Sequence, residues 1–186
     1  GPLGFVAKAA LKASEGSLGM SVEAQYTAPL DSVVAALSGA DIDEDLHVRV
    51  LKGRKKRSDL LARIRSLNPG FASDDLTAFD RVATAEASGD LVGYWCFTMQ
   101  DGNLYERGVA VAGSSRGQGI AGRLLLAAVL SMGTEVESAR LMATSDLFNR
   151  ASRRMLERCG LQLDGLMTRG RLPLMGEFHL MWRPPG

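Results

Sequence analysis

The amino-acid sequence predicts a mixed α+β fold, in which a central, twisted, mostly antiparallel sheet of six to seven strands carries helices on both faces. Strand signals separated by turn-forming residues follow one another from residue 81 to residue 111. Two segments with helical periodicity come next, and a strand signal follows each of them. The 186 residues, of which 46% are hydrophobic and 23% charged, suit one globular domain with a sizeable core.

The first part of the chain is expected to precede this domain. Residues 1–4 resemble the remnant of an expression tag, and the chain has no initiator methionine. Residues 5–45 are interpreted as an N-terminal extension that is partly helical, with a weak helical pattern at residues 6–14 and a further short helix at residues 31–37. The domain itself is expected to span residues 46–186.

The first strand of the domain is expected at residues 46–52, with residues 21–25 as a competing choice. A helix is expected at residues 58–67, because Ser58 can cap it and Pro69 follows its end. One face of this helix is apolar and consists of Leu60, Leu61, Ile64 and Leu67.

Three strands connected by tight turns are expected next, at residues 81–86, 91–99 and 104–111. The turns fall at residues 88–90 and 101–103, which are rich in Gly, Asp and Asn. The second of these strands is almost continuously apolar, and we therefore expect it at the centre of the sheet.

The remaining elements alternate between helix and strand. Residues 120–132 predict a buried helix, and residues 139–144 a short buried strand. Residues 148–159 predict an amphipathic helix, followed by strands at residues 161–168 and 177–182. The apolar stripe of the amphipathic helix comprises Phe148, Ala151, Ser152, Met155, Leu156 and Cys159.

Charge and cysteine content restrict the classes of partner and compartment. The net charge is +1, which gives no overall attraction to nucleic acid or to an anionic membrane. No apolar run is long enough for a membrane span, and Cys96 and Cys159 lie in segments expected to be buried, so a cytoplasmic protein is expected. A run of four basic residues could bind an RNA backbone, an acidic protein or the outer phosphate of a coenzyme, although a solvated loop is the favoured interpretation. This run is Arg54, Lys55, Lys56 and Arg57.

A glycine-rich turn at residues 115–122 lies between a predicted strand and a predicted helix, where backbone N–H groups of the first helical turn can bind an anion. Gly117, Gly119 and Gly122 also satisfy the dinucleotide-binding pattern, and Asp146 follows at a suitable distance. In a dinucleotide-binding fold, however, this pattern follows the first strand, whereas here more than a hundred residues precede it. A turn without any ligand is a third possibility.

Two segments at a characteristic spacing are more specific than the turn alone. The pattern Arg/Gln-x-x-Gly-x-Gly/Ala, shortly after strand residues 109–111, is matched by Arg116, Gly119 and Ala121. These positions resemble motif A of the GNAT superfamily of acetyl-CoA-dependent N-acetyltransferases, and residues 149–152 and 157–161 resemble its motif B. The resemblance covers residues 46–184.

The resemblance implies a GNAT fold with acetyl-CoA as co-substrate, bound in a splay between the fourth and fifth strands, and no metal. The amides of residues 117–122 would bind the pyrophosphate, and Asn149 would bind the pantetheine arm unless it only caps its helix. The residues expected at the coenzyme are Val109, Ala110, Val111, Arg116, Gly117, Gln118, Gly119, Ile120, Ala121, Gly122, Asn149 and Ser152.

The same resemblance implies that an amine attacks the thioester directly, with Glu106 as the candidate base acting through water. A backbone N–H near Val109 would stabilise the oxyanion. Many family members have a tyrosine that protonates the leaving thiolate at the position of Leu156. Water could replace it, and the substitute donors are His179, Tyr94 and Tyr105.

Three hypotheses follow: an N-acetyltransferase, a catalytically silent acyl-CoA-binding module, and a nicotinamide-dependent oxidoreductase. The expected partner is an amine of unidentified structure, and the expected state is a monomer or a homodimer.

Overall fold

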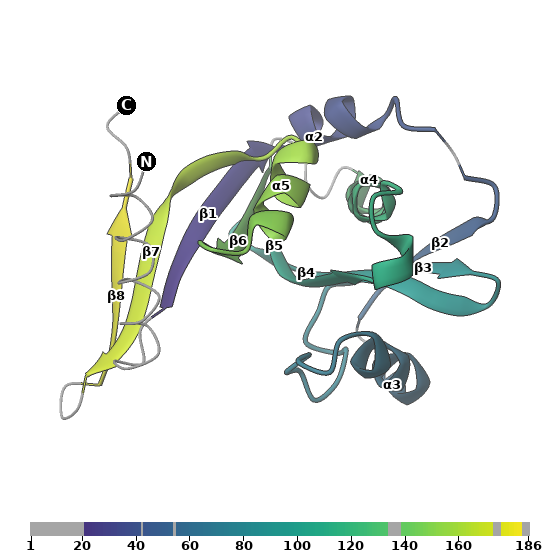
Figure 1. Cartoon of the computed structure of the whole chain (residues 1–186), viewed down its shortest axis with the longest axis horizontal. Coiled ribbons are helices and arrows are strands. Elements are labelled where there is room, and N and C mark those ends of the chain that lie inside the picture. Colours follow the sequence, from purple (N-terminus) through teal and green to yellow (C-terminus); the bar gives the residue numbers. More distant parts are fainter. Residues whose placement is uncertain (1–20, 42, 54, 134–138, 173–175, 184–186) are drawn as a thin grey trace. The chain divides into compact units, whose positions relative to one another are not determined.

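The computed structural model describes residues 21–41, 43–53, 55–133, 139–172 and 176–183 (Figure 1). The tag remnant and the weak helical pattern at residues 6–14 lie outside these ranges. The elements are β1 Ser21–Pro29, α2 Leu30–Leu37, β2 Leu46–Leu51, α3 Ser58–Leu67, β3 Arg81–Ala87, β4 Asp90–Gln100, β5 Asn103–Val111, η1 Gly113–Ser115, α4 Ile120–Met132, β6 Arg140–Asp146, α5 Arg150–Arg158, β7 Gln162–Leu172 and β8 Gly176–Trp182.

The predicted fold class is confirmed. The described strands form one mixed sheet of eight, in the order β2-β3-β4-β5-β6-β1-β7-β8. This sheet has more strands than the six to seven expected, because the two competing choices for the first strand are both strands. The additional strand, β1, alternates between buried and partly exposed residues along its length, as a strand with one covered face does.

The chain divides into two compact units, which are described separately. Among the described residues, the larger unit takes those within 27–143 and 155–162, and the smaller unit takes those within 21–26, 144–154 and 163–183.

In the larger unit, β2 to β5 form an antiparallel meander with α3 on one face and α4 on the other (Figure 1). The core on the α3 face consists of Leu61, Ile64, Leu76, Phe79, Val82, Tyr94 and Cys96. On the opposite face, a Cβ placed on Gly93 would lie 3.0 Å from Cγ2 of Ile120. The absence of a side chain at Gly93 therefore lets the start of α4 pack directly on the centre of the sheet.

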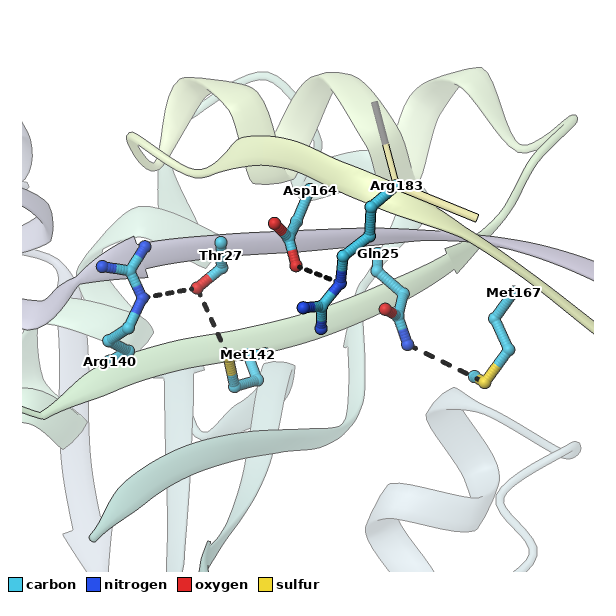
Figure 2. Close-up of polar contacts among 7 residues, drawn as sticks. All are labelled: Gln25, Thr27, Arg140, Met142, Asp164, Met167 and Arg183. Atoms are coloured by element: carbon cyan, nitrogen blue, oxygen red, sulfur yellow. Dashed lines mark hydrogen bonds and ion pairs between the residues drawn. The ribbon is translucent and has the colours of Figure 1, made fainter. Parts of the chain in front are cut away.

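Strand β1 lies beside β6, and the larger unit contains one end of this contact. Figure 2 shows the Thr27 hydroxyl accepting a hydrogen bond from Arg140 Nε (3.1 Å) and donating one to the Met142 sulfur (3.3 Å). The backbone N–H of Leu30 donates to the carbonyl of Ala139 at 3.0 Å.

The smaller unit contains the other end of β1 and the hairpin of β7 and β8. The backbone N–H of Leu147 donates to the carbonyl of Val22 at 3.0 Å. Arg153 Nε donates to the hydroxyl of the fully buried Tyr26 at 2.9 Å. Arg153, which lies outside the predicted apolar stripe, is therefore partly buried, because a buried hydroxyl on β1 attracts its guanidinium. Ala151, expected in the buried stripe, is exposed.

None of the described helices is both long and apolar enough to cross a membrane. Within the described ranges, no group of three or more His, Cys, Asp or Glu side chains could hold a metal ion.

Candidate functional site

The turn before α4 has a conformation that glycine favours. Gly117 and Gly119 have φ angles of 78° and 73°, in the left-handed region that other residues rarely adopt. Within the described part of the chain, a Cβ at either position would have no neighbouring atom within 4 Å, so both glycines face open space there. Arg116 and Gln118 beside them are exposed as well. The turn is therefore kept open by backbone geometry and is accessible to a ligand.

Helix α4 begins directly after this turn. Gly119 is its N-cap and has no side chain to accept a hydrogen bond from the first turn. Ile120 and Ala121 are buried at 3% and 9% exposure, and Gly122 packs against Leu37 of α2. Packing thus holds the first helical turn in place, while its N-terminal end carries uncapped N–H donors and the positive end of the helix dipole.

Strand β5, which leads into this turn, contains a β-bulge. Cys96 of β4 is opposite Gly108, but Phe97 is opposite Glu106, so Arg107 is the extra residue. Arg107 Nε donates to the Thr98 hydroxyl at 2.8 Å. The extra residue of the bulge thus lies directly next to Glu106.

The predicted splay follows the bulge. Strand β5 pairs with β6 in parallel, and their register consists of Leu104 with Leu141 and Tyr105 with Met142. Residues 106–111 of β5 continue beyond this register, so one edge of their backbone is available for another extended chain. Val109, Ala110 and Val111 lie on this part of the strand and are partly exposed.

Glu106 is partly buried and lies near two ionisable groups of the α3-side core. Burial, with a smaller contribution from the negative charge of Glu106, raises the pKa of the Cys96 thiol to about 12. Burial also raises the pKa of Tyr94, with a smaller contribution from Glu106. The Tyr94 hydroxyl accepts a hydrogen bond from Asn68 Nδ2 at 2.7 Å. The carboxylate therefore acts electrostatically on the interior beneath α3, next to the bulge.

The residues of the second motif are divided between the two units. Asn149 and Ser152 belong to the smaller unit, where Asn149 Oδ1 accepts the backbone N–H of Ser152 at 3.0 Å and caps α5. This cap uses the carboxamide oxygen of Asn149 and not its two Nδ2 protons. Leu156 belongs to the larger unit and is 1% exposed, which confirms its predicted place in the buried stripe.

Two of the three substitute proton donors can be placed. Tyr94 is fully buried in the α3-side core. Tyr105 is partly buried, and the guanidinium carbon of Arg107 lies 5.6 Å from the centre of its ring. The side chain of His179 lies outside the described residues.

A model of the acetyltransferase (GNAT) family matches residues 56–161, more than half of the chain. A search among curated proteins finds no match.

Solved structures share the fold. A functionally unknown conserved protein from Staphylococcus epidermidis is similar with a TM-score of 0.62 at 14% identity, over 84% of this chain and 63% of that one. A tandem GNAT protein from the clavulanic acid biosynthesis pathway gives 0.62 at 14% identity, over 95% and 59%. A GCN5-related N-acetyltransferase from Sphaerobacter thermophilus gives 0.56 at 16% identity, over 95% and 57%. The chain thus spans less than two thirds of the length of each, and at these identities the likeness is one of fold.

Proposed function

Because the chain belongs to the GNAT acetyltransferase family, we propose that it transfers the acetyl group of acetyl-CoA to an amine by direct attack of the amine on the thioester. The observation that carries the proposal is the open glycine turn at the uncapped start of α4, directly after a bulged strand with an available edge. The open turn with uncapped N–H groups is what a phosphate group needs, and the available strand edge is what an extended pantetheine arm needs.

The residues present fit the coenzyme. Around Gly117 and Gly119 the space that side chains would fill is empty, so a pyrophosphate can approach the amides of residues 117–122. Backbone groups of Val109 and Val111 would pair with the pantetheine amides. Acetyl-CoA supplies an activated acyl group; the protein supplies its position.

The acceptor amine must lose a proton before or during attack, because an alkyl amine has a pKa near about 10.4. We assign this role to Glu106 acting through water, since it adjoins the bulge and its charge influences neighbouring groups. The backbone N–H at Val109 would stabilise the oxyanion.

The position of Leu156 favours a second candidate, an acyl-CoA-binding module without activity. A buried leucine cannot protonate a thiolate. A thiol with a pKa near about 8.5 can, however, leave as thiolate at neutral pH, so the missing acid does not abolish the reaction. The nicotinamide-dependent alternative is contradicted, because it requires a parallel doubly wound sheet and this sheet is mostly antiparallel.

Two measurements test the proposal. Acetyl-CoA at a hundred times its dissociation constant should stabilise the fold by about 2.7 kcal/mol, and NADPH should not. Release of free thiol in the presence of an amine panel then separates the enzyme from the silent module. A thermal shift with NADPH and none with acetyl-CoA would refute the coenzyme assignment, whereas acetyl-CoA binding without thiol release for any amine would favour the module.

A further inference from the structure

A cavity of about 500 Å³ lies between the start of α3 and strands β2 and β3. Its charged lining comprises four cations and two carboxylates: Arg49, Lys56, Arg57, Arg63, Asp59 and Glu86. Two of these four cations, Lys56 and Arg57, belong to the basic run for which a solvated loop was the favoured interpretation. We call this space the basic cavity.

The basic cavity lies on the face of the sheet opposite α4. Arg49 is paired with Thr84, another residue of the lining, and Thr84 is paired with Tyr94. Paired residues of neighbouring strands point to the same face, and Tyr94 belongs to the core beneath α3. Figure 1 shows α3 and α4 on opposite sides of β3 and β4. The cavity is therefore separate from the glycine turn assigned to the coenzyme.

The cations of the cavity exceed what its own carboxylates neutralise. Glu86 forms an ion pair with Arg63 at 2.8 Å. Arg49, Lys56 and Arg57 then share the cavity with the exposed Asp59. The Nε atom of Arg57 is buried and has no hydrogen-bond partner in the described part of the chain. A buried donor without a partner is unfavourable, so an acceptor entering the cavity would stabilise this side chain.

The start of α3 adds donors to the same space. Arg57 is the N-cap of this ten-residue helix, and its side chain accepts no hydrogen bond from the first turn. Ser58, the first helical residue, also lines the cavity and offers a hydroxyl. Uncapped N–H groups, a hydroxyl and guanidinium groups are the donor set that binds phosphate in proteins.

The chain before the basic run is fixed by packing. A Cβ on Gly53 would overlap the carbonyl oxygen of Phe79 and crowd that of Leu76, so only glycine allows this approach. Helix α3 follows the run immediately. Lys56 and Arg57 therefore stand in the sequence between this closely packed glycine and helix α3.

We propose that the basic cavity binds the phosphate group of a small phosphorylated ligand. A phosphate monoester carries a charge of about −1.5 to −2 near pH 7, which matches the excess of cations. The volume is within the range of about 300–1,000 Å³ found for small-molecule sites, and the cavity thus has room for the body of the ligand as well. A nucleic acid strand is disfavoured, because Asp59 and Glu86 interrupt the positive surface along which a backbone would run.

The test compares adenosine monophosphate with adenosine by isothermal titration, since the two probes differ only in the phosphate. The Gly119→Glu variant serves as the protein in a parallel titration, because its glycine turn is blocked and any remaining binding occurs elsewhere. Adenosine monophosphate should bind at least about tenfold more tightly than adenosine in both proteins, as expected for charge-assisted hydrogen bonds. This outcome does not depend on whether acetyl-CoA is the coenzyme.

Matched variants locate the site. Arg49→Gln and Arg57→Gln should each weaken binding of adenosine monophosphate about tenfold or more, while Lys55→Gln should leave it within about twofold. Lys55 is an exposed member of the same basic run and does not line the cavity. Equal losses of affinity for adenosine monophosphate in all three variants would overturn the proposal, because they would indicate a non-specific electrostatic attraction between the basic run and the phosphate. Absence of binding of adenosine monophosphate would overturn the proposal as well. So would a protein that does not bind the monophosphate but binds a single-stranded RNA, if all three variants weaken the binding of that RNA.

Discussion

Replacement of Leu156 tests the placement of the second motif on α5. Its side chain is 1% exposed, so Leu156→Ala removes about three buried carbon groups, worth roughly 0.8 kcal/mol each. The lost transfer free energy is then roughly 2.4 kcal/mol, and the cavity left behind adds to it, so the expected destabilisation is about 2 to 5 kcal/mol. Leu156→Tyr should lose about 1 to 3 kcal/mol by overpacking and gain no turnover, because the added hydroxyl enters a closed core.

Urea unfolding measures the free energy of unfolding, and thiol release at several pH values measures turnover. Leu130→Ala is the matched control, since Leu130 is also helical but 61% exposed and its loss should change stability by no more than about 0.5 kcal/mol. If Leu156→Ala were as stable as Leu130→Ala, position 156 would not be core. If Leu156→Tyr accelerated thiol release by the factor of about 10² to 10⁴ typical of a general acid, the side chain would instead reach the thioester.

Three further predictions concern the turn, the approach of two backbones and the buried thiol. Gly119→Glu should abolish stabilisation by acetyl-CoA in a thermal shift assay, and it should cost about 1 to 2 kcal/mol of intrinsic stability because residue 119 has a positive φ. The control is Gly113→Glu, in the same loop but without a positive φ, which acetyl-CoA should still stabilise. Gly53→Ala should destabilise by at least about 1 to 3 kcal/mol in urea unfolding, while Gly39→Ala, where a Cβ meets nothing within 4 Å, should be close to neutral; similar values for the two would contradict the close approach. Burial, with a contribution from a nearby carboxylate, raises the pKa of Cys96 to about 12, so the unfolded state loses its thiol proton first, and the stability present below about pH 8.5 is lost as the pH rises towards 12. Cys96→Ala should therefore lose less stability between about pH 8 and pH 10 than the parent protein. Equal losses in the two proteins would argue against this linkage.

Elements with local signals could be predicted closely from the sequence. The helices expected at residues 58–67 and 120–132 begin and end where the structure has them, since helical periodicity and the residues that end each helix agree. The order of strands in the sheet could not be predicted. The alternation of Val22, Ala24 and Tyr26 was visible, but its partner β6 is distant in the sequence, and no local pattern specifies such a pairing.

The candidate site was predictable in the same uneven way. The glycine turn carries a local signature, and its positive φ angles agree with the residue types. The basic cavity was missed, because Arg49 and Arg63 come from a strand and a helix that only tertiary packing brings together. Of the lining residues, the sequence could indicate Lys56 and Arg57, as members of the basic run.

The place of β1 in the sheet has a consequence for synthesis on the ribosome. Thr27 and its partner Arg140 are separated by 113 residues, so the nascent chain exposes β1 long before β6 exists. At about 5–20 residues per second this interval lasts roughly 6 to 23 s, far longer than hairpin formation in a meander such as β3 to β5. During that time β1 is an unpaired, half-apolar strand, and its free edge is available for pairing with another chain.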